Sequence, residues 1–381
     1  MTGPGAGAVT GVGAGAGAGG SGLRVEPVRT RADLREFVAL PLRTHPSELS
    51  VPLLRSVIGR WHRDPGVELW LVRDARGTVL GRATTHEDAR MSERMGGRTL
   101  LVGAVEAATP AALAALLRFA RERAEAAGAT RLLGPVSLLP NQTGGVITSG
   151  WHERGFVDSP WNPPWYVDEW ERAGFERCYT GSTWICENLS VLHPEGLFGG
   201  PVDPRVRVRH ATRRGLREQV PMLRDLLNRS FAGLDYYTHI DERQMADATD
   251  GLAHLLDERL ALWAEVDGRP AAFMLVVPDL SEFVMSTGGR LAVPDAARLL
   301  LTRRRYRREA VLVVKGTVPE HQGRGLMRVL SGELLRGLRA GGYRTLRSTF
   351  VGDDNPASAV QYVRMGGRPL HATTFYRQVL S

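Results

Sequence analysis

Apolar residues along the first half of the chain alternate between strand-like runs and helix-like spacings. After a short strand, a helix is predicted to begin at Thr30 or Arg31, because apolar residues then recur at intervals of three and four. Pro41 is expected to end or kink that helix. The segment 67–86 has two apolar runs around a polar turn, which predicts a β-hairpin.

A strand, a long helix and a further strand are predicted next. Thr109 and Pro110 are suited to be the N-cap and the first residue of the long helix, and Gly128 is suited to end it. The predicted elements are a strand at 99–107, a helix at 110–128, a strand at 130–139 and a short helix ending at Gly174.

The periodicity stops at residues 193–204, which contain three glycines and three prolines. We place a linker there, between an N-terminal domain at 23–192 and a C-terminal domain at 205–381. The first 22 residues are nearly all small, which indicates a flexible, disordered Gly/Ala-rich tail rather than a signal peptide.

The same order of elements is predicted again after residue 204. Each half has the pattern β-α-β-β-β-α-β-α, and the second half has one further strand, so the sequence predicts an internal duplication of an α/β fold. The predicted elements of the second half are strands at 206–211, 311–318, 343–351 and 371–380, helices at 216–231, 325–342 and 355–367, and a hairpin at 260–277 with its turn at Asp267 and Gly268.

Composition limits the classes of protein to which the chain can belong. Its 381 residues are enough for two domains, and no apolar run approaches the roughly 18 residues needed for a membrane span. The formal charge of +8 suggests an anionic partner, although nearly all of it comes from arginine, with Lys315 as the one lysine. Two cysteines are too few for a disulfide framework or a four-ligand zinc site, so we expect a cytoplasmic protein without a metal.

The stretch 318–327 has a strand before it and a helix after it. Gly323 and Gly325 allow the backbone to approach a ligand closely, and the N–H groups at the helix start suit a pyrophosphate. Arg324 and Arg328 could add positive charge. The simpler alternative is a tight turn whose glycines only permit a sharp connection.

The whole C-terminal half resembles the GNAT superfamily of acyl-CoA-dependent acetyltransferases. Its signature is Gln or Arg, two residues, Gly, one residue, and then Gly or Ala. That signature is matched by Gln322 to Leu326, whereas Met327 stands where Gly or Ala is usual. The second motif of the superfamily is matched by Asn355, Ser358 and Tyr362. Over residues 23–381 the chain resembles the tandem YghO-like bacterial proteins, which implies two tandem GNAT-like domains, each a mixed, mostly antiparallel sheet flanked by helices.

This resemblance implies an acyl-CoA site in the second half, with acetyl-CoA or another acyl-CoA as the donor substrate. Tyr362 would be the catalytic residue, near the donor sulfur. The pantetheine arm would lie on the backbone of Thr317 and Val318. The pyrophosphate site would be formed by Gln322, Gly323, Arg324, Gly325, Leu326 and Met327, and Asn355 and Ser358 would complete the donor site. Asn355 also suits a simple N-cap role before Pro356.

The first half has no glycine loop, so we expect no cofactor there. The acceptor would be an amine of a small molecule or a peptide, and the sequence defines neither its identity nor the oligomeric state. Two alternatives stay open. GNAT-like folds can take an aminoacyl group from charged tRNA, which the arginine-rich segment 302–309 would suit, and a degenerate domain could act as a non-catalytic binding module. No membrane partner is expected, and no nucleic acid except tRNA under the first alternative.

Overall fold

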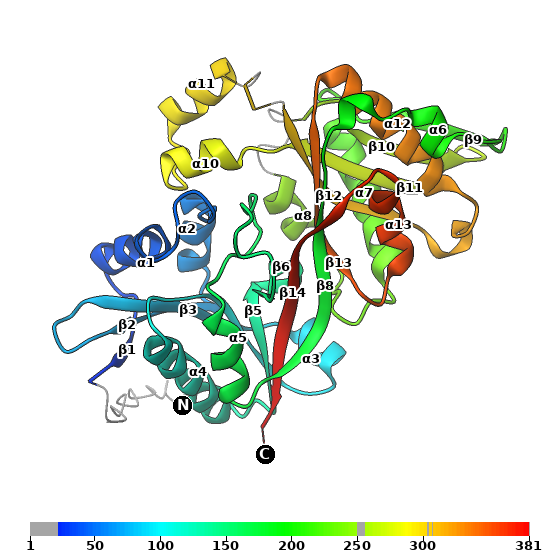
Figure 1. Ribbon diagram of the computed structural model, residues 1–381. Helices are drawn as coiled ribbons and strands as arrows, with labels where there is room; N and C mark the ends of the chain where they lie inside the picture. The colour runs from blue at the N-terminus through cyan, green and yellow to red at the C-terminus, as the bar shows by residue number, and fades with distance from the viewer. Residues whose placement is uncertain (1–21, 250–255, 303–304, 307, 381) are drawn as a thin grey trace, which may run out of the picture.

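A computed structural model describes residues 22–249, 256–302, 305–306 and 308–380 (Figure 1). The predicted tail therefore lies outside the described residues except for Gly22. Residues 303, 304 and 307 of the arginine-rich segment also lie outside them.

The elements of the first half follow the predicted order. They are β1 (Arg24–Pro27), α1 (Arg31–Thr44), α2 (Arg55–Arg63), β2 (Val67–Arg73), β3 (Val79–Glu87), α3 (Ala89–Met95), β4 (Thr99–Ala107), α4 (Pro110–Ala126), β5 (Arg131–Ser137), β6 (Leu139–Gly144), β7 (Val146–Ile147), α5 (Trp165–Arg172) and β8 (Glu176–Cys186).

The second half repeats that order. Its elements are η1 (Leu189–Val191), α6 (Pro194–Phe198), β9 (Val206–His210), α7 (Leu216–Phe231), α8 (Glu242–Thr249), β10 (Ala261–Val266), β11 (Arg269–Pro278), α10 (Ser281–Thr287), α11 (Val293–Thr302), β12 (Glu309–Thr317), η2 (Pro319–His321), α12 (Leu326–Gly341), β13 (Thr345–Gly352), α13 (Pro356–Arg364) and β14 (Arg368–Val379).

Two expectations need correction. Helix α1 does not end at Pro41 but runs through it to Thr44, and it begins with a capping box between Thr30 and Asp33. The first half also has the closing strand β8, which was expected only in the second half. Its sequence, ERCYTGSTWIC, has no regular alternation of apolar and polar residues, and it pairs with β14 on one side and β13 on the other.

All strands of the described residues belong to one sheet, in the order β1-β2-β3-β4-β5-β14-β8-β13-β12-β11-β10-β9, with β6 on β5 and β7 on β14. Strand β8 of the first half therefore pairs with β13, and β14 of the second half pairs with β5. Figure 1 shows the two exchanged strands side by side at the centre. A domain boundary at 193–204 stays a proposal, and that segment contains α6, which packs on α12.

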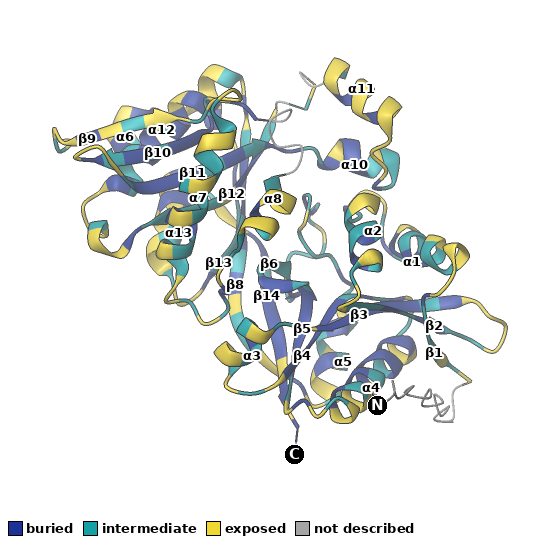
Figure 2. Ribbon diagram, turned by 180° about the vertical axis from the view of Figure 1, so that it is seen from behind, coloured by how far each residue is buried: buried dark blue, intermediate teal, exposed yellow. Residues whose placement is uncertain are grey.

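Each half has its own apolar core under its longest helix. Helix α4 buries a row of alanine and leucine side chains together with Trp170, whose ring stacks on Tyr376 of β14. Helix α12 buries Leu330, Leu334 and Leu338 against β10 to β12. Strands β3, β4 and β5 are the most continuously buried, whereas β8 and β13 at the centre of the sheet have several partly exposed residues (Figure 2).

A substitution of Phe375 on β14 tests whether the exchange of β8 and β14 between the two halves stabilises both of them. Its ring contacts Tyr179 of β8 and Phe350 of β13, and it is 3% exposed. We expect Phe375→Ala to lower the free energy of unfolding by about 3–5 kcal/mol in a single urea transition. Val379→Ala, at an exposed position of the same strand, should change it by less than about 0.5 kcal/mol. Two separate transitions would show that the halves unfold independently.

Candidate functional site

The two parallel strands at the centre of the second half separate as they leave the core. Strands β12 and β13 pair from Glu309 and Thr345 to Leu312 and Ser348. Beyond that pair, β12 continues to Thr317 and β13 to Gly352 without pairing with each other. The register of β12 against β11 also shifts between Val276 and Leu275, opposite this point. The result is a fork whose edges offer unpaired backbone groups.

The glycine loop lies at the open end of the fork, between β12 and α12. Gly323 and Gly325 both have φ of 75°, the left-handed region in which glycine is least strained. Helix α12 has no side-chain cap, and among the described residues the backbone N–H groups of 323–327 have no acceptor. These donors, with the positive end of a 16-residue helix, form a site suited to an anion.

The corresponding position in the first half is closed. The side chain of Thr109 caps α4 by accepting a hydrogen bond from the N–H of Ala112 at 3.2 Å. Strand β6 pairs with β5 and lies against β4. At Gly103, an added Cβ would come within 2.3 Å of the Val136 carbonyl oxygen. The first half therefore lacks both the free N–H groups and the fork.

The two arginines expected to serve the loop have different surroundings. The guanidinium of Arg328 donates to the carbonyl oxygens of Phe198 and Gly199 at 3.1 and 2.8 Å, and to that of Pro201 at 2.6 Å. It thus holds the end of α6, and it also lies beside Gly325, where an added Cβ would be 3.8 Å from its Nε. Its contribution of charge to the loop stays a prediction. Arg324 is exposed beside the free N–H groups.

The other predicted loop residues line the same turn with different exposures. The Gln322 amide donates to the carbonyl oxygen of Thr317 at 3.3 Å, which braces the turn. Val318 and Leu326 are buried, and the N–H of Val318 already bonds to Ala271. Met327 is partly buried and packs on the core. The described structure therefore brings all six residues of 322–327 to one turn.

Helix α13 lies along the fork and carries the second predicted motif. Asn355 is its N-cap and accepts a hydrogen bond from the N–H of Ser358 at 3.3 Å, so the capping role weighed from the sequence is present. Tyr362 is 1% exposed and stacks on Trp184 of β8, with ring centroids 5.9 Å apart. Burial raises the pKa of its phenol, and its contact with Ser348 opposes this rise. Its hydroxyl therefore stays protonated and faces the end of the β12–β13 pairing.

Three carboxylates of the second half are already paired with arginine. Asp279 lies 3.3 Å from the guanidinium of Arg347, which also pairs with Glu309. Glu320 pairs with Arg229. Each carboxylate is neutralised by an arginine, so none of these is placed as a free base.

Lys315 is a site residue that the sequence analysis did not identify. Its ammonium group donates to the carbonyl oxygen of Ser358 and to Oε1 of Gln361, both at 2.8 Å, and lies 4.5 Å from the ring centroid of Tyr362. Desolvation lowers its pKa to about 7. The feature of the sequence that could have identified it is that Lys315 is the one lysine in an arginine-rich chain.

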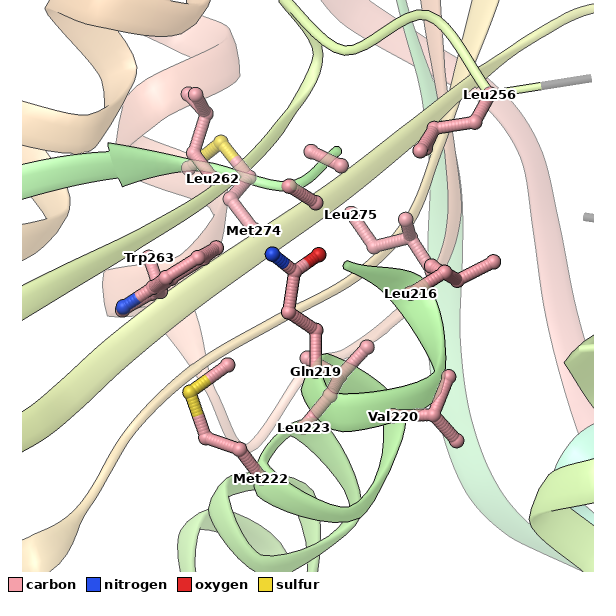
Figure 3. A pocket seen from close by; sticks show the side chains of 12 residues that line it. Leu216, Gln219, Val220, Met222, Leu223, Leu256, Leu262, Trp263, Met274 and Leu275 are labelled. Atoms are coloured by element: carbon pink, nitrogen blue, oxygen red, sulfur yellow. The ribbon is translucent and has the colours of Figure 1, made fainter. Parts of the chain in front are cut away.

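A small apolar hollow lies elsewhere in the second half, between the start of α7 and strands β10 and β11 (Figure 3). Leu216, Leu223, Trp263 and Leu275 line it, and Gln219 is the polar side chain among its lining residues. This lining offers no charge for a phosphate group, so the hollow and the glycine loop are suited to different ligands.

The comparisons with known proteins agree with this geometry. No family model matches the chain. It is 26% identical to Protein YghO of Escherichia coli (strain K12) over 280 residues, 70% of this chain and 71% of YghO. It is 24% identical to the bacterial ceramide synthase of Caulobacter vibrioides (strain NA1000 / CB15N) over 299 residues, 73% and 76% of the two chains.

A solved tandem GNAT protein from the clavulanic acid biosynthesis pathway covers 94% of this chain, and this chain covers 98% of that one, with a TM-score of 0.56 and 18% identity. The chain has a tandem GNAT fold and resembles YghO. The predicted fold class is thereby confirmed, although the sheets of the two halves are joined into one. In the described residues no helix has the length and apolar character to span a membrane, and no three potential metal ligands come together.

The different surroundings of Arg328 and Arg324 give a stability prediction. We expect Arg328→Met to lower the free energy of unfolding by about 1–2 kcal/mol, because three partly exposed hydrogen bonds to α6 are lost. Arg324→Met should change it by less than about 0.5 kcal/mol. Urea denaturation of both variants measures this, and equal effects would contradict the assigned roles.

Proposed function

We propose that this protein is an N-acyltransferase that moves an acetyl or other acyl group from acyl-CoA to an amine. The observation that carries the proposal is the row of free N–H groups at 323–327, placed at the open end of the β12–β13 fork. The pyrophosphate of CoA would accept from these groups. The pantetheine arm would lie in the fork beside the backbone of Thr317 and Val318; both backbone groups of Val318 already bond to Ala271 and His321, so the hydrogen bonds to the arm would come from the unpaired part of the fork.

Tyr362 is the proposed catalytic residue at the inner end of the fork. The reaction forms an acyl–nitrogen bond and breaks the acyl–sulfur bond, so the departing thiolate needs a hydrogen bond or a proton. A phenol whose pKa is raised by burial remains a donor at neutral pH. Its contact with Ser348, the last paired residue of β13, supports this role.

The acceptor is proposed only as a primary amine. The Caulobacter relative carries the name ceramide synthase, and making a ceramide joins an acyl group to an amine, which is the same class of reaction. A tRNA-borne donor and a non-catalytic binding role are the competing functions, and binding measurements with CoA and with tRNA separate them.

Gly325 provides the most direct test of the donor site. We expect Gly325→Glu to weaken acetyl-CoA binding by about 3 kcal/mol, because its carboxylate would repel the pyrophosphate at the N–H groups, which corresponds to roughly 100-fold in Kd. Isothermal titration calorimetry measures this.

Gly342→Glu is the matched control, because Gly342 ends the same helix with φ of 78° and so introduces the same backbone strain. Its affinity should equal that of the wild type. An unchanged affinity in Gly325→Glu would remove the loop from the donor site, and salt-dependent tRNA binding in its place would favour the competing donor.

Tyr362→Phe keeps the ring on Trp184 and removes the hydroxyl. With an amine acceptor found by screening, turnover should fall by roughly 10²–10⁴-fold while the affinity for acetyl-CoA stays within a few fold. Val363→Ala, at an exposed position of the same helix, controls for disturbance of α13. Turnover close to wild type in the phenylalanine variant would exclude Tyr362 from the reaction.

A further inference from the structure

Lys315 lies where the fork, α13 and the predicted sulfur position meet. It is on β12, opposite Met274 of β11 and past the last residue of β12 that pairs with β13. Its Nζ donates to the Ser358 carbonyl oxygen and the Gln361 side chain, and it lies over the ring of Tyr362. One side chain thus joins the strand of the fork to the helix that carries the proposed catalytic residue.

The positive charge of Lys315 is not balanced by the protein. Among the described residues no carboxylate forms an ion pair with it. The titratable groups that face it are Tyr362 on α13 and Cys186 on β8. Burial raises the pKa of the Cys186 thiol to about 12 and raises that of the Tyr362 phenol. Both neighbours are therefore neutral near pH 7, and neither supplies a counter-charge.

Gln361 provides a second, independent observation. It is 7% exposed, its Oε1 accepts from Lys315, and its Nε2 is buried without a hydrogen-bond partner among the described residues. Buried polar groups in proteins are nearly always paired, so an unpaired amide next to an unpaired charge indicates that an acceptor from a ligand belongs there.

Composition also supports a specific need for lysine. The chain has 49 basic residues, of which Lys315 is the one lysine. Arginine stays protonated in proteins and cannot exchange a proton at neutral pH, whereas a desolvated lysine can. Lys315 is therefore a side chain that can exchange a proton, and it lies beside the proposed catalytic residue Tyr362.

We propose that Lys315 supplies the positive charge and the proton that the departing thiolate requires, with Tyr362 as the accompanying hydrogen-bond donor. This inference rests on the proposed function. As the acyl–nitrogen bond forms and the acyl–sulfur bond breaks, the ammonium of Lys315 gives its proton to the sulfur. The resulting neutral amine takes up the proton that the acceptor nitrogen loses, so the protons balance without a carboxylate base.

The single lysine allows a direct test without knowledge of the acceptor. In protein labelled with ¹³C at lysine Cε, one resonance reports Lys315. Its titration midpoint should lie near 7 in the free protein and should rise when CoA, which is anionic, is added. A midpoint near the ordinary value of about 10.4 in the free protein would overturn the inference.

Calorimetry at pH 7 in buffers of different ionisation enthalpy gives the matching measurement. Wild type should take up about half a proton more on binding CoA than Lys315→Met, because a group half-protonated near its pKa becomes charged in the complex. Val360→Ala, at an exposed position of the same helix α13, should keep the wild-type uptake.

The outcomes separate this inference from the proposed function. If CoA binds but neither the midpoint nor the proton uptake depends on Lys315, the role of Lys315 is refuted and the donor site stands. If CoA does not bind to the wild type at all, the proposed function fails, and the role of Lys315 fails with it.

Discussion

The exchange of β8 and β14 between the two halves is the constraint on which the rest of the structure depends. Each strand fills a place in the sheet of the other half, so neither half can close its sheet alone. The exchange also forms the floor of the candidate site, because β8 brings Trp184 onto the ring of Tyr362 and places Cys186 beneath α13. The first half thus contributes side chains to a site whose backbone belongs to the second.

Two repeats of one fold differ here in particular at the start of the helix that follows the fourth strand. In the first half a threonine hydroxyl and a proline satisfy or remove the N–H groups that a helix start leaves free. In the second half a glycine with positive φ stands there, and those groups stay free. The backbone N–H groups at a capped helix start are already hydrogen-bonded, whereas those at an uncapped start are available to bind an anion. This difference supports the proposal that the second repeat, rather than the first, binds acyl-CoA.

Local patterns in the sequence predicted the features that local chemistry determines. The bounds of α7 at 216–231, the turn at Asp267 and Gly268 and the glycine loop all follow from periodicity, turn residues and caps. Strand β8 was missed because the strands that pair with it, β13 and β14, are distant in sequence. For the same reason the contacts of Arg328 with the end of α6 were not predicted, since its acceptors lie about 130 residues away. The role of Lys315 could not be predicted from the sequence, because its contacts with α13 form only when the chain folds and places α13 over β12.

The proposed function requires that the protein binds one acyl-CoA molecule, at the glycine loop of the second half. A crystal structure determined with CoA tests this most directly. We expect a pyrophosphate within hydrogen-bond distance of the N–H groups of 323–327, with the pantetheine arm between β12 and β13. Clear density for CoA at the start of α4, or at any place outside the β12–β13 fork, would contradict this expectation.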